Sequence, residues 1–150
     1  LYDRVAAKGG GTAVFMNSAQ GGMVTADCRG PEGKDIQTWE ECQRIGNLLA
    51  DEALRIVAEA PVQENPGLYC TAKDVTFDVD SEELRMIASA SPIGMTLSPG
   101  NTIVTQMNLA NIGNAQILTI PGEALPNIGY YLKRNMNGED NFLYGLTNDA

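Results

Sequence analysis

The chain of 150 residues contains no histidine, and this absence excludes several kinds of catalytic site. Without an imidazole, the chain alone cannot form a Ser-His-Asp triad or a zinc site with histidine ligands. Basic residues are also few, since 10 Lys and Arg face 19 Asp and Glu and leave a net charge of −9. A surface this acidic repels phosphate groups, so we expect no nucleic-acid partner.

Cysteines and long hydrophobic runs are scarce as well. Cys28, Cys42 and Cys70 form no CxxC motif, and an odd number argues against a disulfide framework. Three free thiols are the simplest interpretation, although a Cys28–Cys70 or Cys28–Cys42 bridge is compatible with an exported protein. No apolar run approaches the roughly 20 residues of a membrane-spanning helix, so we expect no transmembrane segment.

The composition is that of a globular domain, with 43% hydrophobic and 19% charged residues. Both ends of the sequence nevertheless read as interrupted. Leu1 is not an initiator residue and no signal-peptide pattern follows it, while residues 141–150 read as a strand and an abrupt stop. We therefore expect residues 1–150 to form a single domain or a fragment of a larger catalytic domain.

A long amphipathic helix is the clearest element in the sequence. Thr38 and Glu41 have the spacing of a capping box, and apolar residues then recur every three or four positions up to Ala60-Pro61. The apolar run at residues 12–17, between glycine-rich segments, predicts a buried strand.

The remaining pattern alternates strands and helices. We expect a half-buried strand at 68–79, a short helix from 81, a loop at 88–101, strands at 102–109 and 115–120, a helix at 125–136 and a strand at 142–146. This order predicts an α/β fold, a mixed sheet with helices packed on it. Because the ends read as interrupted, we expect the domain to be incomplete.

Three segments follow the ends of predicted strands and are rich in small or polar residues, namely 20–27, 121–123 and 147–149. Strand ends of an open sheet can lie along one edge and form a crevice for a ligand. Glu123 then has two interpretations, because a carboxylate in the first turn of a helix stabilises its N-terminus, while one at a strand end serves as a ligand or an acid/base.

Thr25, Asp27 and Asn148 also have two interpretations. Each side chain can cap backbone amides in a turn. Thr25 acts as a nucleophile only where a base or a metal activates it, and no such base is visible in the sequence. Asn148 is most simply explained by a turn.

Several blocks of the sequence carry a resemblance. They are Asn108-Leu-Ala-Asn-Ile-Gly-Asn-Ala-Gln-Ile-Leu-Thr-Ile-Pro-Gly-Glu123, a helix with Gly129 and Lys133-Arg134, and Phe142-Leu-Tyr-Gly-Leu-Thr-Asn148, preceded by a long helix with Arg44-Ile-Gly46. In this order they resemble the catalytic domain of the neutral/alkaline, non-lysosomal ceramidases. Members of that family are zinc-dependent amidases that cleave the N-acyl bond of ceramide.

The resemblance implies roles for individual residues. Glu123 matches a zinc ligand of the family, and Thr25 takes the place of its serine nucleophile. The family has Gly-x-x-Ser-Pro-Asn where this chain has Gly22-Met-Val-Thr-Ala-Asp27, so three positions of the motif differ. The family's zinc histidines lie upstream, and a tyrosine ligand lies downstream of this sequence. The expected substrate-binding residues are Gln20, Gly21, Gly22, Asp27 and Asn148.

The leading hypothesis is a portion of a zinc-dependent amide (N-acyl) hydrolase similar to neutral ceramidase and inactive on its own. Zinc is expected in the parent protein and not in this chain alone. The substrate would be a lipid or another N-acyl compound, although no lipid-binding groove is visible in the sequence. The chain would associate with the rest of the catalytic domain, and the family is often exported or membrane-associated. The alternatives are a non-catalytic α/β binding or structural domain and a subunit completed by a partner chain.

Overall fold

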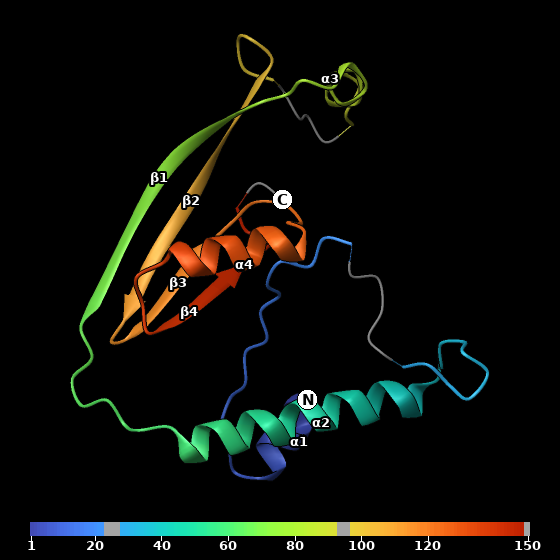
Figure 1. The fold of residues 1–150 in the computed structure, drawn as a ribbon, viewed down its shortest axis with the longest axis vertical. Coiled ribbons are helices and arrows are strands. Elements are labelled where there is room, and N and C mark those ends of the chain that lie inside the picture. Colours follow the sequence, from blue (N-terminus) through green and yellow to red (C-terminus); the bar gives the residue numbers. More distant parts are fainter. Residues whose placement is uncertain (23–27, 93–96, 149–150) are drawn as a thin grey trace. The chain divides into compact units, whose positions relative to one another are not determined.

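The computed structural model describes residues 1–22, 28–92 and 97–148 (Figure 1). The helices and strands in these ranges are α1 (Tyr2–Ala7), α2 (Trp39–Glu59), β1 (Leu68–Asp78), α3 (Glu82–Ser89), β2 (Thr102–Ile112), β3 (Ala115–Thr119), α4 (Pro126–Asn135) and β4 (Asp140–Tyr144). They belong to two compact units. The helical unit comprises Leu1–Met16 and Gly22–Glu64, and the sheet unit comprises Asn17–Gly21 and Asn65–Ala150.

Helix α2 confirms the predicted long helix of the helical unit. Thr38 is its N-cap and accepts a hydrogen bond from the backbone N–H of Glu41 at 3.2 Å, as the capping pattern predicts. The helix ends at Glu59, because the residue before Pro61 is disfavoured in the helical conformation. Helix α1 contacts α2 and is joined to it by an ion pair between Arg4 and Asp51.

The predicted strand at residues 12–17 is wrong. The structure assigns no strand to these residues, and Val14 is 79% exposed. An apolar run shows a tendency toward burial, but a strand also needs a neighbouring strand to satisfy its backbone groups. Flanking glycines, which lose more conformational freedom on ordering than other residues, weaken the tendency further.

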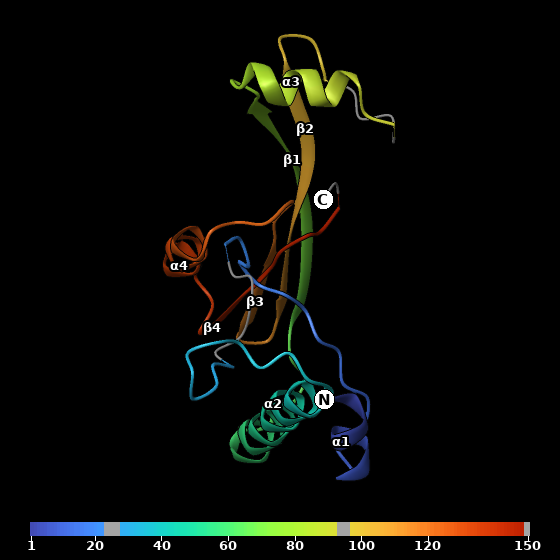
Figure 2. The same cartoon turned by 90° about the vertical axis from the view of Figure 1, so that its right-hand side faces the viewer.

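The sheet unit contains a four-stranded mixed sheet in the order β1-β2-β3-β4, which confirms the predicted α/β class. Strands β1 and β2 pair antiparallel over their full length, and β2 pairs antiparallel with β3 through a tight turn at Gly113-Asn114. Strands β3 and β4 are parallel, and α4 connects them. Figures 1 and 2 show the long antiparallel pair β1–β2 and α4 beside β3 and β4.

The predicted helices at 81 and 125–136 and the predicted strands from residue 68 onward are all present, with small shifts at their ends. The expected half-burial of β1 is wrong, because every residue of this strand except Val75 is exposed. Strand β1 lies at the edge of the sheet in the described structure and lacks a covering layer on its faces.

Few hydrophobic residues of the described sheet unit are buried; Ala88 lies on α3, and two others lie near the ends of β3 and β4. Leu143 on β4 is 2% exposed, and Ile120, directly after β3, is 5% exposed. These two residues therefore support the edge of the sheet at which the predicted site residues emerge.

The three cysteines are free thiols, with Cys28 half-buried and Cys42 and Cys70 exposed. Among the described residues, no helix combines the length and the apolar character that a bilayer crossing requires.

Candidate functional site

The C-terminal ends of β3 and β4 lie at the same edge of the sheet because these two strands are parallel. Their register runs from Ala115↔Asp140 to Thr119↔Tyr144, and Ile120 continues it by donating its N–H to the carbonyl of Tyr144 at 2.8 Å. The loops that follow the two strands therefore leave the sheet side by side, as the strand-end hypothesis predicts.

A third segment, Asn17–Gly21, is hydrogen-bonded to both of these loops. Gly145 donates its N–H to Asn17 O at 3.0 Å, and Gly21 donates to Ala124 O at 2.8 Å. The two loops also contact each other, since Leu146 donates to Gly122 O at 3.0 Å. Segments separated by about a hundred residues in sequence thus meet in one place.

Glycine is required at two points of this meeting because backbones approach closely there. A Cβ atom at position 21 would overlap the carbonyl oxygen of Glu123, and one at position 145 would lie 2.5 Å from the carbonyl oxygen of Ser18. Both glycines are buried. Gly21 was predicted to bind substrate. Its lack of a side chain allows the segment Asn17–Gly21 to pass close to the backbone of Glu123.

The side chains of Gln20 and Glu123 meet at this edge. Gln20 Nε2 donates a hydrogen bond to Glu123 Oε1 at 3.2 Å, across 103 residues of sequence. The rest of the Glu123 carboxylate is open to solvent, because this residue is exposed. Together with the loop at Thr147 and Asn148, these two side chains form what we call the strand-end site.

Glu123 does not lie in the first turn of a helix. Helix α4 begins at Pro126 with Leu125 as its N-cap, and its first turn contains no acidic residue. The interpretation of Glu123 as a first-turn carboxylate is therefore wrong. Its carboxylate is positioned by the β3–α4 loop and by Gln20 instead.

Asn148 and Thr147 hold the second loop in place. Asn148 Nδ2 donates to Gln106 O at 2.6 Å, and the residue has a φ of +60°, a left-handed conformation that asparagine tolerates better than most residues. Thr147 Oγ1 donates to Ile120 O at 2.8 Å. The positive φ of Asn148 agrees with a turn, but its side chain donates to a carbonyl of β2, 42 residues away, instead of capping a nearby backbone amide. Thr147 lies in the predicted segment 147–149, although the sequence did not single out its hydroxyl.

Of the remaining predicted site residues, Thr25 and Asp27 lie outside the described residues, so their roles stay predictions. Gly22 is exposed with a φ of +76°, and it belongs to the helical unit.

A catalytic zinc ion usually takes three protein ligands, and the strand-end site provides a single carboxylate. Nowhere in the described ranges do three His, Cys, Asp or Glu side chains gather closely enough to hold a metal ion. The residues described here therefore do not by themselves fit a zinc ion, and we derive no catalytic step through one.

The fold and site together define an α/β chain with a polar site at the ends of two parallel strands. Comparison of the chain with protein-family models, with curated proteins and with solved structures found no match.

Proposed function

We propose that this chain forms part of an N-acyl amide hydrolase and contributes the strand-end site to one wall of its active-site cleft. The observation that carries the proposal is the hydrogen bond from Gln20 to Glu123, made across 103 residues at the edge where two parallel strands end. Open sheets bind ligands at such edges. The proposal also rests on the resemblance of Ile120-Pro-Gly-Glu123 and its surroundings to neutral ceramidases.

Within this proposal Glu123 is the reactive carboxylate, either as one ligand of a zinc ion or as an acid/base group. Glu123 is an exposed residue and Gln20 donates to its Oε1, so Oε2 is the oxygen that would meet a ligand. Gln20 is then a positioning residue, because a hydrogen bond to a carboxylate fixes its orientation. Histidine ligands would have to come from outside this sequence, which contains none.

Thr25 remains the proposed nucleophile. Its hydroxyl would attack the amide carbonyl carbon while a base takes its proton, the C–N bond would break as the leaving amine receives that proton, and water would then hydrolyse the acyl ester on Thr25. A lipid amide is the substrate that the resemblance favours.

The test uses the native protein that contains this chain and measures bound zinc and hydrolysis of a fluorogenic N-acyl amide. Glu123→Gln keeps the shape of the side chain and removes its charge, and we expect it to lower kcat by about 10²- to 10⁴-fold. Gln20→Leu, which acts through Glu123, is expected to cost roughly 10- to 100-fold in activity or metal affinity.

Glu64→Gln serves as the control because it makes the same charge change at an exposed position of the helical unit. Unchanged zinc content and unchanged hydrolysis in Glu123→Gln would contradict the proposal. Wild-type hydrolysis in Thr25→Ala would contradict the assignment of the nucleophile alone.

The second candidate is a subunit that a partner chain completes. The exposure of large apolar side chains favours it, since Trp39, Val57 and Leu68 are 70%, 72% and 78% exposed. Monomeric proteins seldom leave so much apolar surface in water. A monodisperse monomer in sedimentation velocity, with one cooperative unfolding transition, would count against this candidate.

A further inference from the structure

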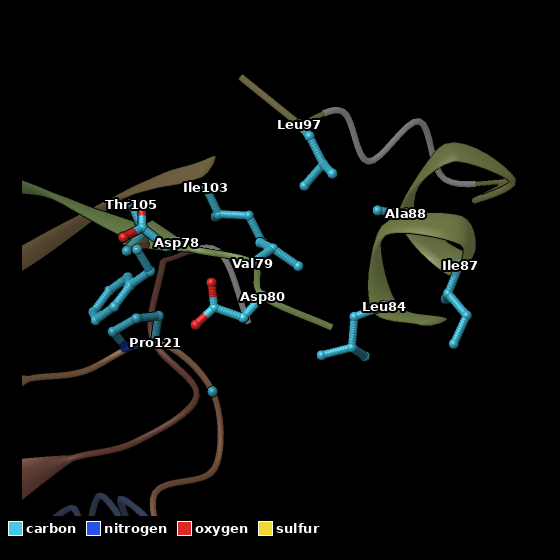
Figure 3. A pocket seen from close by; sticks show the side chains of 12 residues that line it. Asp78, Val79, Asp80, Leu84, Ile87, Ala88, Leu97, Ile103, Thr105 and Pro121 are labelled. Carbon is cyan, nitrogen blue, oxygen red and sulfur yellow. The ribbon is translucent and has the colours of Figure 1, made fainter. Parts of the chain in front are cut away.

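An apolar pocket of about 530 Å³ lies between α3 and the end of the β1–β2 strand pair (Figure 3). Its walls come from the end of β1, from α3, from β2 and from Pro121-Gly122 in the loop after β3. Phe77, Leu84 and Ile87 line it and remain 47%, 56% and 58% exposed. An occupant with an apolar body would therefore cover side chains that the described chain leaves in contact with water. The sequence did not predict this pocket.

Two carboxylates give the pocket a definite charge. Asp78 and Asp80 are both among its lining residues, and both are exposed. In Figure 3 the Asp80 side chain extends into the space between Pro121 and α3. Neither aspartate forms an ion pair with another described residue, and the described lining contains no Lys or Arg. The pocket thus combines apolar walls with two carboxylate-bearing residues in its lining.

The position of α3 over this pocket has an identifiable cause. Ser81 caps the helix by accepting a hydrogen bond from the N–H of Leu84 at 3.2 Å. Arg85 on the same helix donates from Nη1 to the carbonyl oxygen of Val79 at 3.0 Å, which joins α3 to the chain that leaves β1. These two bonds hold α3, which carries Leu84, next to residues 78–80, which carry the two carboxylates.

We propose that this pocket binds a small organic cation, an alkyl- or arylammonium ion. Its apolar body would cover Phe77, Leu84 and Ile87, and its ammonium group would meet the carboxylates of Asp78 and Asp80. A neutral apolar ligand would leave these carboxylates without a partner and partly desolvated, and an anionic ligand would be repelled by them. The net charge of −9 further favours the approach of a cation. This proposal goes beyond the hydrolase proposal, because it depends neither on a metal nor on Glu123.

The test compares three probes of similar shape on the unmodified chain by isothermal titration calorimetry. They are phenethylammonium, the neutral 2-phenylethanol and the anionic 3-phenylpropionate. We expect phenethylammonium to bind several-fold more tightly than the alcohol, the anion to bind least, and the preference for the cation to shrink as salt is added. Backbone amide shifts at 77–88 would report the location of binding.

The variants Asp78→Asn and Asp80→Asn test the two carboxylates separately. Each is expected to weaken phenethylammonium about two- to fivefold, as for exposed ion pairs, and to leave 2-phenylethanol unchanged. Asp74→Asn is the matched control, because Asp74 lies on β1 as well, is exposed and does not line the pocket.

Equal binding of the three probes, or no binding of the cation, would overturn the proposal. So would cation binding that survives both aspartate substitutions or falls equally in Asp74→Asn. A second copy of the chain in the pocket would appear as a dimer in sedimentation that Leu84→Ser makes monomeric, and this too would overturn the proposal. None of these measurements involves turnover, so their failure would leave the hydrolase proposal untouched.

Discussion

Replacing Gly129 with alanine tests whether the segment Asn17–Gly21 packs on α4, as the strand-end site requires. Gly129 is a buried residue of this helix, and a Cβ atom added there would lie 2.5 Å from Cβ of Ala19. Carbon atoms prefer separations of about 3.5–4.0 Å, so the added methyl overlaps its neighbour by about 1 Å or more. Hydrogen bonds from Gly145 to Asn17 and from Gly21 to Ala124 restrain the segment, so Ala19 cannot simply move away.

Two opposing effects set the expected magnitude. Alanine is about 1 kcal/mol more favourable than glycine inside a helix, which stabilises the Gly129→Ala variant. Overpacking of a well-filled contact costs about 1–3 kcal/mol. We expect the overlap to win, and Gly129→Ala to lower the free energy of unfolding by about 1 kcal/mol.

A reciprocal substitution makes the test sharp. Ala19→Gly removes the obstructing methyl, and by itself should cost about 1 kcal/mol through lost burial and added freedom of the unfolded chain. In the double variant the overlap is gone and the helix keeps its alanine, so its stability should return close to that of the wild type. The change in the free energy of unfolding of the double variant would then differ by about 2 kcal/mol from the sum of the changes in the two single variants.

Urea denaturation followed by far-UV circular dichroism measures these differences. Gly67→Ala is the control, since no atom lies within 4 Å of the added methyl, and it should be neutral or slightly stabilising. The reasoning is refuted if Gly129→Ala is about 1 kcal/mol more stable than the wild type and shows no coupling to Ala19→Gly. That result would mean that helix propensity acts alone and that the segment does not lie on α4.

Two further predictions concern the helical unit. Hydrogen bonds from Arg4 and Lys8 hold the pKa of Asp51 well below its usual range. The stability that these bonds contribute is therefore present above pH about 4, and it is lost as the pH falls below that value and the carboxylate becomes protonated. Amide shifts of α1 should follow this loss in acid, and Asp51→Asn should remove the pH dependence; an unchanged acid transition in that variant would contradict the ion pairs. Thr38→Ala should destabilise α2 by about 1 kcal/mol in thermal unfolding, because the N–H of Glu41 loses its acceptor, whereas Thr38→Ser should restore most of the loss. A Thr38→Ala variant as stable as the wild type would show that the cap is not formed.

Local signals predicted most of the secondary structure. The Thr38 cap and Pro61 mark the ends of α2 in the sequence itself, and Pro126 marks the start of α4. These residues act through the backbone of their immediate neighbours, so their effect is readable without the rest of the chain. The run at residues 12–17 failed because a strand depends on a distant partner, which local composition does not reveal.

The candidate site was predictable only in part. Strand-end loops at 121–123 and 147–148 were found from pattern, since polar and small residues follow apolar runs there. The role of Gln20 as a partner of Glu123 had no sequence signal, because the two residues are 103 positions apart. The pocket between α3 and the β1–β2 strand pair likewise had no sequence signal, because its lining comes from four separate parts of the chain.

The sequence by itself determined the types of element, their order, the acidic charge and the lack of histidine, all of which are local or summed properties. The tertiary structure alone decided that Gly21 passes beside Glu123, that Glu123 lies outside the first turn of α4, and that Asp78 and Asp80 share an apolar pocket. The physical reason is that strand register and loop closure bring distant residues together, and the free energy of those contacts depends on the whole unit rather than on any single stretch of residues.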